Sequence, residues 1–270
     1  MREVIVCGNP LYHVMGMWLN FYSRWQDEVD HLRTDLTTKI HSDKLRDMVR
    51  ESKADYLLLC EDDGIIFKKG IVDKYFKMLE SGEFDVIGSQ RFSCGQEIAR
   101  IVTKKFGITY EGLGDHGPAF WPNFFFVKRD LLMQTDLDFF PHGWKKGEIL
   151  LGEEMQADDT GDTMVHLSLQ IHNLTNRILY VPQYHASPYD FEEFKNNLGV
   201  FDGICPWVHM GSLSGDFTTP HSELEFAELE RRAMWNEMCG KDMTETINKY
   251  GLSKERIERR KLMYHGVLWT

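Results

Sequence analysis

Hydrophobic positions along the first 90 residues fall into alternating blocks with two different periods. A continuous apolar run, typical of a strand buried on both faces, occurs at 56–60, and further strands are predicted at 4–7, a short run rich in β-branched residues, and at 85–88. Between the first two runs, apolar residues recur at helical spacings of four, three and four, at Val14, Trp18, Phe21 and Trp25. A short strand is predicted at 30–33. Helices are predicted at 45–49 and at 71–79, and Ser42 is the expected N-cap of the first of these two helices. This alternation predicts an α/β fold, a mainly parallel sheet with helices on both faces.

After residue 110 the pattern predicts a shaped loop, shorter strands and a helical C-terminal part. The loop is expected over 112–122, which is rich in glycine, proline and aromatic residues. Strands are predicted at 124–127 and 178–181, and helices at 128–135 and from Asp162 onward. Ser222 and Glu225 have the spacing of a capping box that opens a helix-rich final segment. We therefore expect one domain over 1–215 and a helical extension over 216–270 packed on it.

Composition and charge exclude several classes of protein. With 42% hydrophobic and 27% charged residues, the chain is typical of a globular protein and not of a disordered one. Thirty-one basic against 42 acidic residues give a net charge of −11, which disfavours a nucleic-acid partner. The five cysteines are scattered and odd in number, which favours free thiols. No apolar run is long enough for a transmembrane segment and no signal peptide is evident, so a cytoplasmic location is expected.

The strongest chemical signal is a run of three acids at the end of a buried strand. Glu61, Asp62 and Asp63 follow the apolar run 56–60 directly. Adjacent carboxylates repel one another, and a divalent cation bound by their oxygens would relieve that repulsion. Mg²⁺ or Mn²⁺ in such a site would also hold a diphosphate. The alternative interpretation is a solvated acidic turn.

The order of several motifs resembles the nucleotide-sugar-dependent glycosyltransferases of the GT-A fold. In that family a buried strand ends in a metal-binding carboxylate motif, here Glu61-Asp62-Asp63. The other matching segments are Val4–Pro10, Gly117–Phe120, Asn123–Arg129, Gly161–Leu169 and Val208–Ser212. Together they span about residues 3–215. Two departures are Glu61, where the family commonly has Asp, and Gly161, where it commonly has Glu. The resemblance implies a GT-A-like (Rossmann-like) catalytic domain over 1–215.

The resemblance also implies a donor site and a metal site. Asp63 is the expected main ligand of Mn²⁺ or Mg²⁺, with Glu61 and His209 as further ligands. His185 is a less favoured alternative to His209, which could also be an ordinary packed histidine. Residues expected to contact the nucleotide sugar are Asn9, Pro10, Arg33, Asp35, Glu61 and Asp62. For Arg33 and Asp35 the alternative is a surface position after a strand.

Catalysis and acceptor binding are assigned on the same resemblance. Asp162 is the expected general base, which takes a proton from the acceptor hydroxyl. Its alternative role is that of an acid in the first turn of a helix, and Glu154 or Glu153 could be the base instead. Trp121 and Asn123 are the expected acceptor contacts. Other aromatic candidates for stacking on a sugar are Phe120, Trp144 and Trp207.

These assignments predict a metal-dependent hexosyltransferase. Its donor would be a nucleoside-diphosphate sugar, most simply a UDP-sugar, and its acceptor a glycan or another hydroxyl. A nucleic-acid acceptor is disfavoured by the net charge unless Lys104-Lys105 or Lys145-Lys146 lines the cleft. Two alternatives are a nucleotidyltransferase, for which the first loop lacks the expected basic residue, and a non-catalytic carbohydrate-binding protein on the same fold.

Overall fold

The computed structural model describes residues 1–8, 12–67, 69–91, 95–106, 119–161, 164–181, 207–209 and 217–268. The chain divides into two compact units. Unit 1 takes its described residues from Met1–Cys7, Glu28–Glu61 and Gly70–Gln183, and unit 2 from Gly8–Asp27, Asp62–Lys69 and Tyr184–Thr270. The division after residue 215 stays a prediction, since unit 2 also includes two segments from the first 70 residues.

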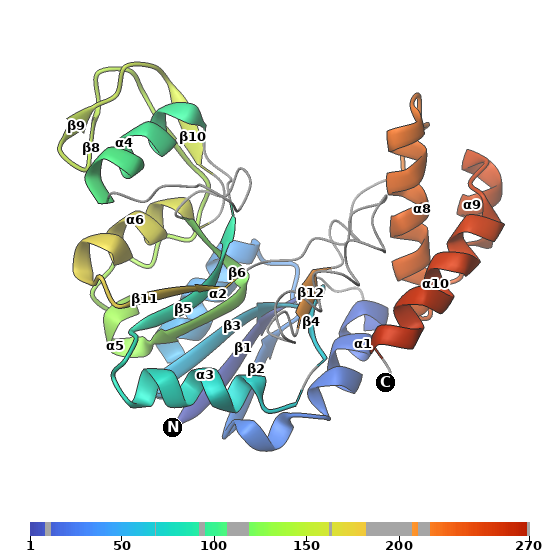
Figure 1. Cartoon of the computed structure of the whole chain (residues 1–270), viewed down its shortest axis with the longest axis horizontal. Coiled ribbons are helices and arrows are strands. Elements are labelled where there is room, and N and C mark those ends of the chain that lie inside the picture. Colours follow the sequence, from blue (N-terminus) through green and yellow to red (C-terminus); the bar gives the residue numbers. More distant parts are fainter. Residues whose placement is uncertain are drawn as a thin grey trace. The chain divides into compact units, whose positions relative to one another are not determined.

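Unit 1 is built on a six-stranded sheet in the order β11-β5-β6-β3-β1-β2 (Figure 1). The strands are β1 Arg2–Cys7, β2 His31–Asp35, β3 Tyr56–Glu61, β5 Val86–Arg91, β6 Ala119–Lys128 and β11 Ile178–Val181. The pairs β1–β2, β1–β3 and β5–β11 are parallel, whereas β6 is antiparallel to both β3 and β5. The prediction of an α/β fold with a mainly parallel sheet is confirmed.

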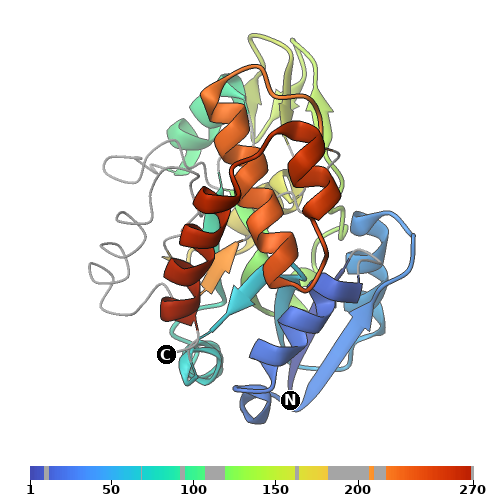
Figure 2. The same cartoon turned by 90° about the vertical axis from the view of Figure 1, so that its right-hand side faces the viewer.

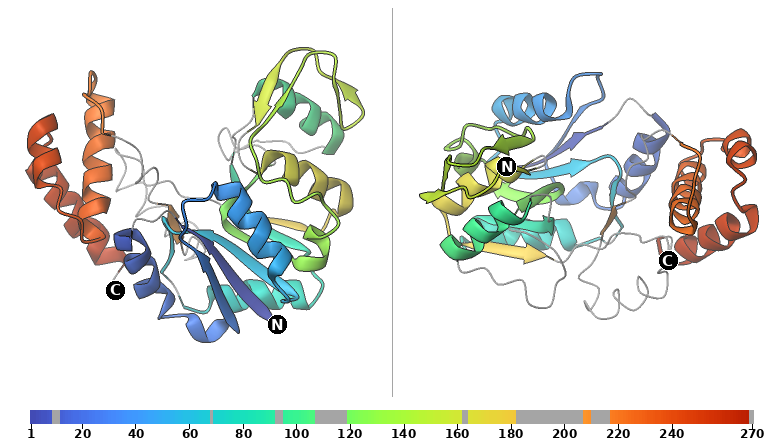
Figure 3. Two further views of the ribbon diagram at one scale, coloured as in Figure 1. Left: turned by 180° about the vertical axis from the view of Figure 1, so that it is seen from behind. Right: turned by 90° about the horizontal axis from the view of Figure 1, so that it is seen from above.

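Helices cover both faces of this sheet (Figure 1 and Figure 3). They are α2 His41–Glu51, α3 Ile71–Glu80, α5 Arg129–Leu132 and α6 Val165–Leu174. The remaining helix of unit 1, α4 Gln96–Phe106, packs on the strands of residues 142–161, and only the last residue of the 3₁₀ helix η1, Gln26–Glu28, belongs to this unit. Successive residues of a strand point to opposite faces. Accordingly, Phe126 of β6 packs against Tyr75 and Phe76 of α3, while its neighbours Phe125 and Val127 belong to the core that α2 and α6 cover.

The predicted loop over 112–122 is partly wrong, because strand β6 begins at Ala119. Pairing with β5 is irregular there: Gly88 pairs with Phe125, but Gln90 already pairs with Phe120. The residues of β6 between those two pairs therefore form a bulge. Proline has no N–H to donate, and it is tolerated at position 122 because the hydrogen-bond ladder is interrupted. Residues 107–118 lie outside the described part of the chain.

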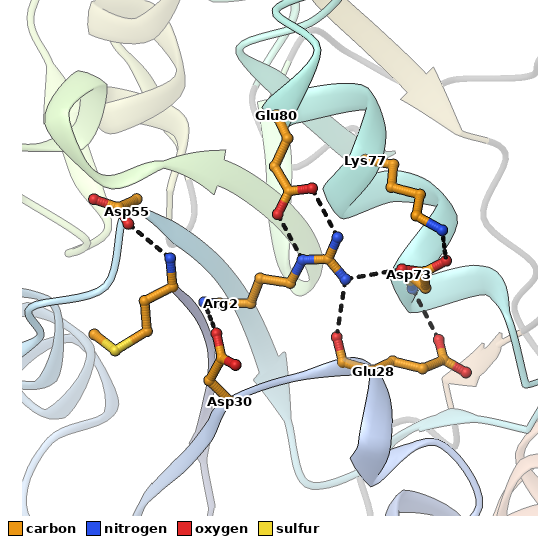
Figure 4. Close-up of polar contacts among 8 residues, drawn as sticks. Arg2, Glu28, Asp30, Asp55, Asp73, Lys77 and Glu80 are labelled. Carbon is orange, nitrogen blue, oxygen red and sulfur yellow. Dashed lines mark hydrogen bonds and ion pairs between the residues drawn. The ribbon is translucent and has the colours of Figure 1, made fainter.

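An arginine near the N-terminus ties β1 to Glu28 and to α3 within unit 1 (Figure 4). Nε and Nη2 of Arg2 donate to the two carboxylate oxygens of Glu80, both at 2.7 Å. Its Nη1 donates to Asp73 Oδ1 at 2.9 Å and to the carbonyl oxygen of Glu28 at 3.3 Å. The hydrogen bonds from Arg2 lower the pKa of Glu80, and those from Lys77 and Arg2 lower that of Asp73. Arg2 of β1 is thereby joined to Glu28 and, through charged groups, to α3.

Residues 142–161 of unit 1 form a ribbon of short strands that packs on α4. The strands are β7 His142–Trp144, β8 Ile149–Leu150, β9 Glu153–Glu154 and β10 Asp159–Gly161, paired β7–β10 and β8–β9. Asp159 Oδ2 accepts the backbone N–H groups of Glu97 and Ile98, both at 2.9 Å, and so caps α4 from outside the helix. A Cβ on Gly95 would lie 1.6 Å from Asp159 Oδ1, so this cap requires glycine.

Two predicted helix starts have different outcomes. Ser42 is not the N-cap of α2, whose N-cap is Ile40; the Ser42 hydroxyl instead donates to the carbonyl oxygen of Phe139 at 3.0 Å. Ser222 is the N-cap of α8 as predicted, since its hydroxyl accepts the N–H of Glu225 at 3.2 Å. The start of α2 differs because a partner 97 residues away takes the serine hydroxyl.

Unit 2 joins the helix after β1 to the C-terminal helices (Figure 2). Its elements are α1 Tyr12–Tyr22, β4 Gly64–Ile66, β12 Trp207–His209, α8 Glu223–Met238, α9 Thr244–Tyr250 and α10 Lys254–Leu268. One apolar core holds Met17 and Phe21 of α1, Ile65 of β4, Trp235 of α8 and Ile257 of α10. The helix predicted at 14–25 is confirmed over 14–22, and Val14 and Phe21 of its predicted apolar stripe belong to this core, whereas Trp25 lies beyond the end of α1.

Candidate functional site

Three residues of unit 1 form one row at the carboxyl ends of β2, β1 and β3: Asp35, Cys7 and Glu61. Asp35 and Glu61 are predicted donor contacts, and Cys7 lies between them. Cys7 pairs in register with Asp35 on one side and with Glu61 on the other. The Cys7 thiol donates to the carbonyl oxygen of His41, the first residue of α2, over 3.6 Å. Ligands of parallel α/β sheets bind beyond the carboxyl ends of the strands. Asp35 and Glu61 therefore lie at the edge of the sheet where a donor site is expected.

Asp35 is kept ionised at this edge. Its Oδ1 accepts the backbone N–H of Thr37 at 2.8 Å. Burial raises the pKa of Asp35, but the hydrogen bonds from Thr37 and the charges of Lys44 and Lys39 outweigh it and hold the pKa below its ordinary value. A carboxylate in this state can accept hydrogen bonds from a sugar hydroxyl.

The other two acids of the trio belong to unit 2. Asp62 is buried and Asp63 half-buried, in the turn between the end of β3 and β4. Cys239, just after α8, donates its thiol to Met17 Sδ at 3.3 Å. Burial, together with the charges of Asp62 and Asp63, raises the pKa of Cys239 to about 12. These carboxylates therefore place negative charge next to a protonated thiol at the end of α8.

The short sheet of unit 2 brings His209 beside the trio. β12 pairs antiparallel with β4, with His209 opposite Gly64 and Val208 opposite Ile65. Gly64 directly follows Asp63, although 145 residues separate His209 from Gly64 along the chain. The side chain of His209 lies outside the described part of the chain, so only its backbone position is given. The assignment of His209 and Asp63 to one ligand set stays a prediction.

Arg33, by contrast, points toward the opposite end of its strand. Its Nε donates to Glu3 Oε1 at 2.9 Å, and its Nη1 to Glu51 Oε2 at 3.4 Å. It helps to line a hollow of about 590 Å³ at the amino ends of β1 and β2, with Met1, Glu3, His31, Leu32, Glu51 and Lys53. Both contacts to carboxylates stabilise the unit. The role of Arg33 in donor binding stays a prediction.

Two aromatic candidates for acceptor stacking are wrong, because their rings are in the core. Phe120 is 1% exposed and stacks on Tyr180 with ring centroids 5.4 Å apart. Trp144 is buried in the cluster between the ribbon and α4. The backbone of Trp121 and Asn123 lies in the bulge of β6, and bulges commonly redirect side chains near active sites. Their own side chains, and that of Trp207, lie outside the described part.

The acidic stretch of the ribbon is mostly engaged in structure. Glu153 accepts from Lys104 Nζ at 2.7 Å, which lowers its pKa, and Asp158 accepts from Lys145 Nζ at 3.0 Å. These pairs also occupy one lysine of each predicted basic patch. Glu154 is exposed in β9. Asp162 lies outside the described residues, between the end of β10 at Gly161 and the start of α6 at Val165. Asn9 and Pro10 also lie outside them.

A second group with metal-binding chemistry was not predicted. Asp136, Asp138 and His166 of unit 1 bring ligand atoms within 4.8 Å of one another. Asp136 Oδ2 lies 3.0 Å from His166 Nε2 and accepts from Gln170 Nε2 at 2.6 Å. Burial raises the pKa of Asp136, but hydrogen bonds from the Asp138 N–H, Gln170 and His166 outweigh it. The Asp-x-Asp spacing of 136 and 138 was the available signal, but His166 is too distant in sequence to be linked to it.

Among the described residues, no helix is both long and apolar enough to cross a membrane. The described cysteines Cys7, Cys60 and Cys239 form no disulfide bond with one another, and Cys94 and Cys205 lie outside the described part.

Comparison with known proteins gives weak structural likenesses. No protein-family model and no curated protein matches the sequence. The chain is similar to the mannosyltransferase PcManGT from Pyrobaculum calidifontis, solved with GDP-Man and Mn²⁺, at 11% identity and a TM-score of 0.44, over 99% of this chain and 85% of that one. It is similar to the galactosyltransferase LgtC, solved with donor and acceptor sugar analogues, at 9% identity and a TM-score of 0.43, over 89% and 95% of the two chains.

A third solved structure is the glycosyltransferase GlyE of Streptococcus pneumoniae, at 12% identity and a TM-score of 0.36, over 89% of this chain and 63% of that one. All three of these proteins are glycosyltransferases. Because the TM-scores are below 0.5, these similarities do not identify a donor, an acceptor or a metal for this chain.

Proposed function

We propose that this protein transfers a glycosyl group from a nucleoside-diphosphate sugar to a hydroxyl acceptor with the help of a divalent cation. The observation that carries the proposal is the pairing of β12 with β4, which puts His209 opposite Gly64, the residue after Asp63. The order of motifs predicts this neighbourhood from two segments far apart in sequence. A chance acidic turn gives no reason for a histidine strand to pair beside it.

The donor set fits a divalent cation that accepts oxygen and nitrogen ligands. Asp63 supplies a carboxylate and His209 an imidazole, with Glu61 as a further carboxylate. Carboxylates suit Mg²⁺ and Mn²⁺, and an imidazole nitrogen favours Mn²⁺ over Mg²⁺. A cation held by these residues would neutralise the charge that develops on the departing diphosphate.

The protein's own acids supply the other half of the reaction. Asp162 takes the proton of the acceptor hydroxyl while the acceptor oxygen bonds to the anomeric carbon. The bond from that carbon to the diphosphate oxygen breaks, and its electron pair leaves with the diphosphate. Glu154 is the second candidate for this proton transfer. Asn9, Pro10, Arg33, Asp35 and Asp62 are proposed for donor binding, and Trp121 and Asn123 for the acceptor.

Donor and acceptor are proposed only by class. A UDP-sugar carrying a hexose is the proposed donor, and a glycan or another hydroxyl compound the proposed acceptor. The net charge of −11 makes a nucleic-acid acceptor unfavourable, because binding to a phosphate backbone depends on basic residues. A cytoplasmic location is proposed on the sequence alone.

The test is donor hydrolysis with Mn²⁺ across UDP-, GDP- and dTDP-sugars, comparing the wild type with Asp63→Asn. Losing an outer partner of a metal ligand commonly costs 10–100-fold, so losing the ligand itself should lower the rate by at least about 100-fold. Asp136→Asn is the matched control, because it alters the other metal-binding group and should leave the rate within about threefold.

Two results would contradict the proposal. The first is a wild type that hydrolyses none of these donors and whose melting temperature does not respond to Mn²⁺ with UDP or GDP. The second is an Asp63→Asn variant that retains full metal-dependent activity while Asp136→Asn loses it, which would move the metal to the second group.

A further inference from the structure

The first turn of α2 lies against the row of residues at the carboxyl edge of the sheet. Cys7, in the middle of this row, contacts the carbonyl oxygen of His41 and packs in the same core as Leu45 and Met48 of α2. Residues that are in register on neighbouring parallel strands point to the same face. Asp35 and Glu61, on either side of Cys7, therefore face the helix that begins with His41.

Among the described residues, the ring nitrogen Nε2 of His41 lies near a carboxylate oxygen of Glu61 that could accept a hydrogen bond from it. Its Nε2 is shielded from solvent, has no hydrogen-bond partner among the described residues and lies 3.5 Å from Glu61 Oε1. A carboxylate is an acceptor only, so Nε2 must carry a proton for this contact to be favourable. Hydrogen bonds at catalytic sites are often long without substrate and shorten in the complex.

The helix itself gives no reason for a histidine at this place. α2 starts at His41, behind an exposed Ile40 with no side-chain cap. The positive end of the helix dipole favours acidic residues in the first turn and disfavours a group that can become cationic. The contact of His41 with Glu61, and not the stability of α2, therefore explains its position.

We propose that His41 is a positioning residue for Glu61. It donates through Nε2–H to Oε1 and fixes the rotation of the carboxylate that the sequence assigns to the ribose or the cation of the donor. This inference rests on the proposed function, because it gives Glu61 the task that the sequence assigns to it. It adds His41 as a determinant of donor affinity.

The test compares His41→Leu with His41→Gln. Leucine fills the space without a donor, whereas the glutamine amide can place an N–H near the position of Nε2. His41→Leu is expected to raise the KM for the nucleotide sugar by about tenfold, as for the loss of one hydrogen bond to a charged group, with kcat within about threefold of the wild type. His41→Gln is expected to recover most of the affinity.

A binding measurement separates this proposal from the proposed function. Titration calorimetry with UDP or GDP and Mn²⁺ should show about tenfold weaker nucleotide binding for His41→Leu and nearly wild-type binding for His41→Gln. The control is His221→Leu, an exposed histidine just before the N-cap of α8, which should match the wild type. Circular dichroism establishes that each variant is folded, and if His41→Leu is not, His41→Asn replaces it, since the shorter amide cannot reach Glu61 from the position of Nε2.

The outcomes are distinct. A wild type that neither binds these nucleotides nor acts on any donor contradicts the proposed function. A wild type that does both, together with His41→Leu equal to it or His41→Gln as impaired as His41→Leu, overturns the positioning role alone.

Discussion

At the scale of single residues, Asp85 shows how unit 1 accommodates a buried charge. Its side chain is 9% exposed and accepts from Lys128 Nζ at 2.7 Å, the Thr175 hydroxyl at 2.6 Å and Arg177 Nη2 at 2.7 Å. Burial by itself raises the pKa of Asp85, but these hydrogen bonds outweigh burial and hold the pKa below its ordinary value. The residue thus links the amino ends of β5 and β11 to the end of β6.

Asp85→Ala is expected to lower the free energy of unfolding by about 1.5 kcal/mol at pH 7, because it removes hydrogen bonds to a buried carboxylate, while Lys128 and Arg177, 25% and 53% exposed, stay solvated. Since folding lowers the pKa of Asp85, its contribution is complete above the unfolded value of about 3.9 and disappears as the pH falls through the folded pKa. Urea unfolding of both proteins between pH 7 and pH 3 measures this.

The difference in the free energy of unfolding between the wild type and Asp85→Ala should become smaller only at the acidic end of that pH range. Asp130→Ala, on the exposed side of α5, is the control and should change stability by less than about 0.5 kcal/mol. A constant difference down to pH 3 would contradict the role of the Asp85 carboxylate.

Arg33 and Asp35 show what residue types alone could and could not predict about the site. Both follow the same strand pattern, and the sequence assigns both to donor binding. The structure keeps Asp35 at the carboxyl edge but ties Arg33 to Glu3 and Glu51, because a long guanidinium side chain reaches partners that no local pattern specifies. The acid trio was predictable because it interrupts an apolar run, whereas the group of Asp136, Asp138 and His166 forms only on folding.

At the scale of elements, α4 begins with a cap supplied by a distant strand. Asp159 satisfies two N–H groups at the start of the helix, and Gly95 leaves the space for its carboxylate. The cap joins the ribbon to the helix that carries its apolar contacts. Such a cap is set by the tertiary structure and not by the local sequence.

Asp159→Ala is expected to lower the free energy of unfolding by about 1 kcal/mol, the usual cost of losing an N-cap, and Asp159→Asn by less, because the amide oxygen still accepts. Gly95→Ala should cost at least as much as Asp159→Ala, since its methyl group would displace the carboxylate. Urea unfolding measures the change in the free energy of unfolding of each variant. Hydrogen exchange at the backbone amides of Glu97 and Ile98 shows whether the change arises at the start of α4. Unchanged exchange at these two amides in Asp159→Ala would show that the cap is unimportant.

Periodicity was a good guide to strands and a weaker one to element ends. The predicted strand at 178–181 coincides with β11, and the buried run 56–60 lies within β3. The misplaced cap at Ser42 and the unexpected length of β6 both depend on contacts between distant segments, Phe139 in one case and the bulged pairing with β5 in the other. Element type was therefore predictable from local sequence, but boundaries set by tertiary contacts were not.

At the scale of the whole molecule, the two units are interleaved along the chain. The chain passes from one unit to the other after residues 7, 27, 61, 69 and 183. Val14, Met17 and Phe21 of α1 and Ile65 of β4 share one core with α8, α9 and α10. A boundary at residue 215 would divide that core.

A chain shortened to residues 1–215 is accordingly expected to aggregate or to remain partly unfolded, because it exposes the apolar side of α1 and β4. Size-exclusion chromatography and thermal melting, with the full chain as reference, measure this. A monomeric fragment with a sharp unfolding transition would instead support an independent domain ending at residue 215.

The interleaving of the units also has a consequence for biosynthesis. A ribosome releases α1 early, whereas α8, which completes its core, emerges some 200 residues later. At about 5–20 residues per second, the apolar side of α1 remains uncovered for tens of seconds during translation. The nascent chain therefore exposes this apolar surface over most of its synthesis.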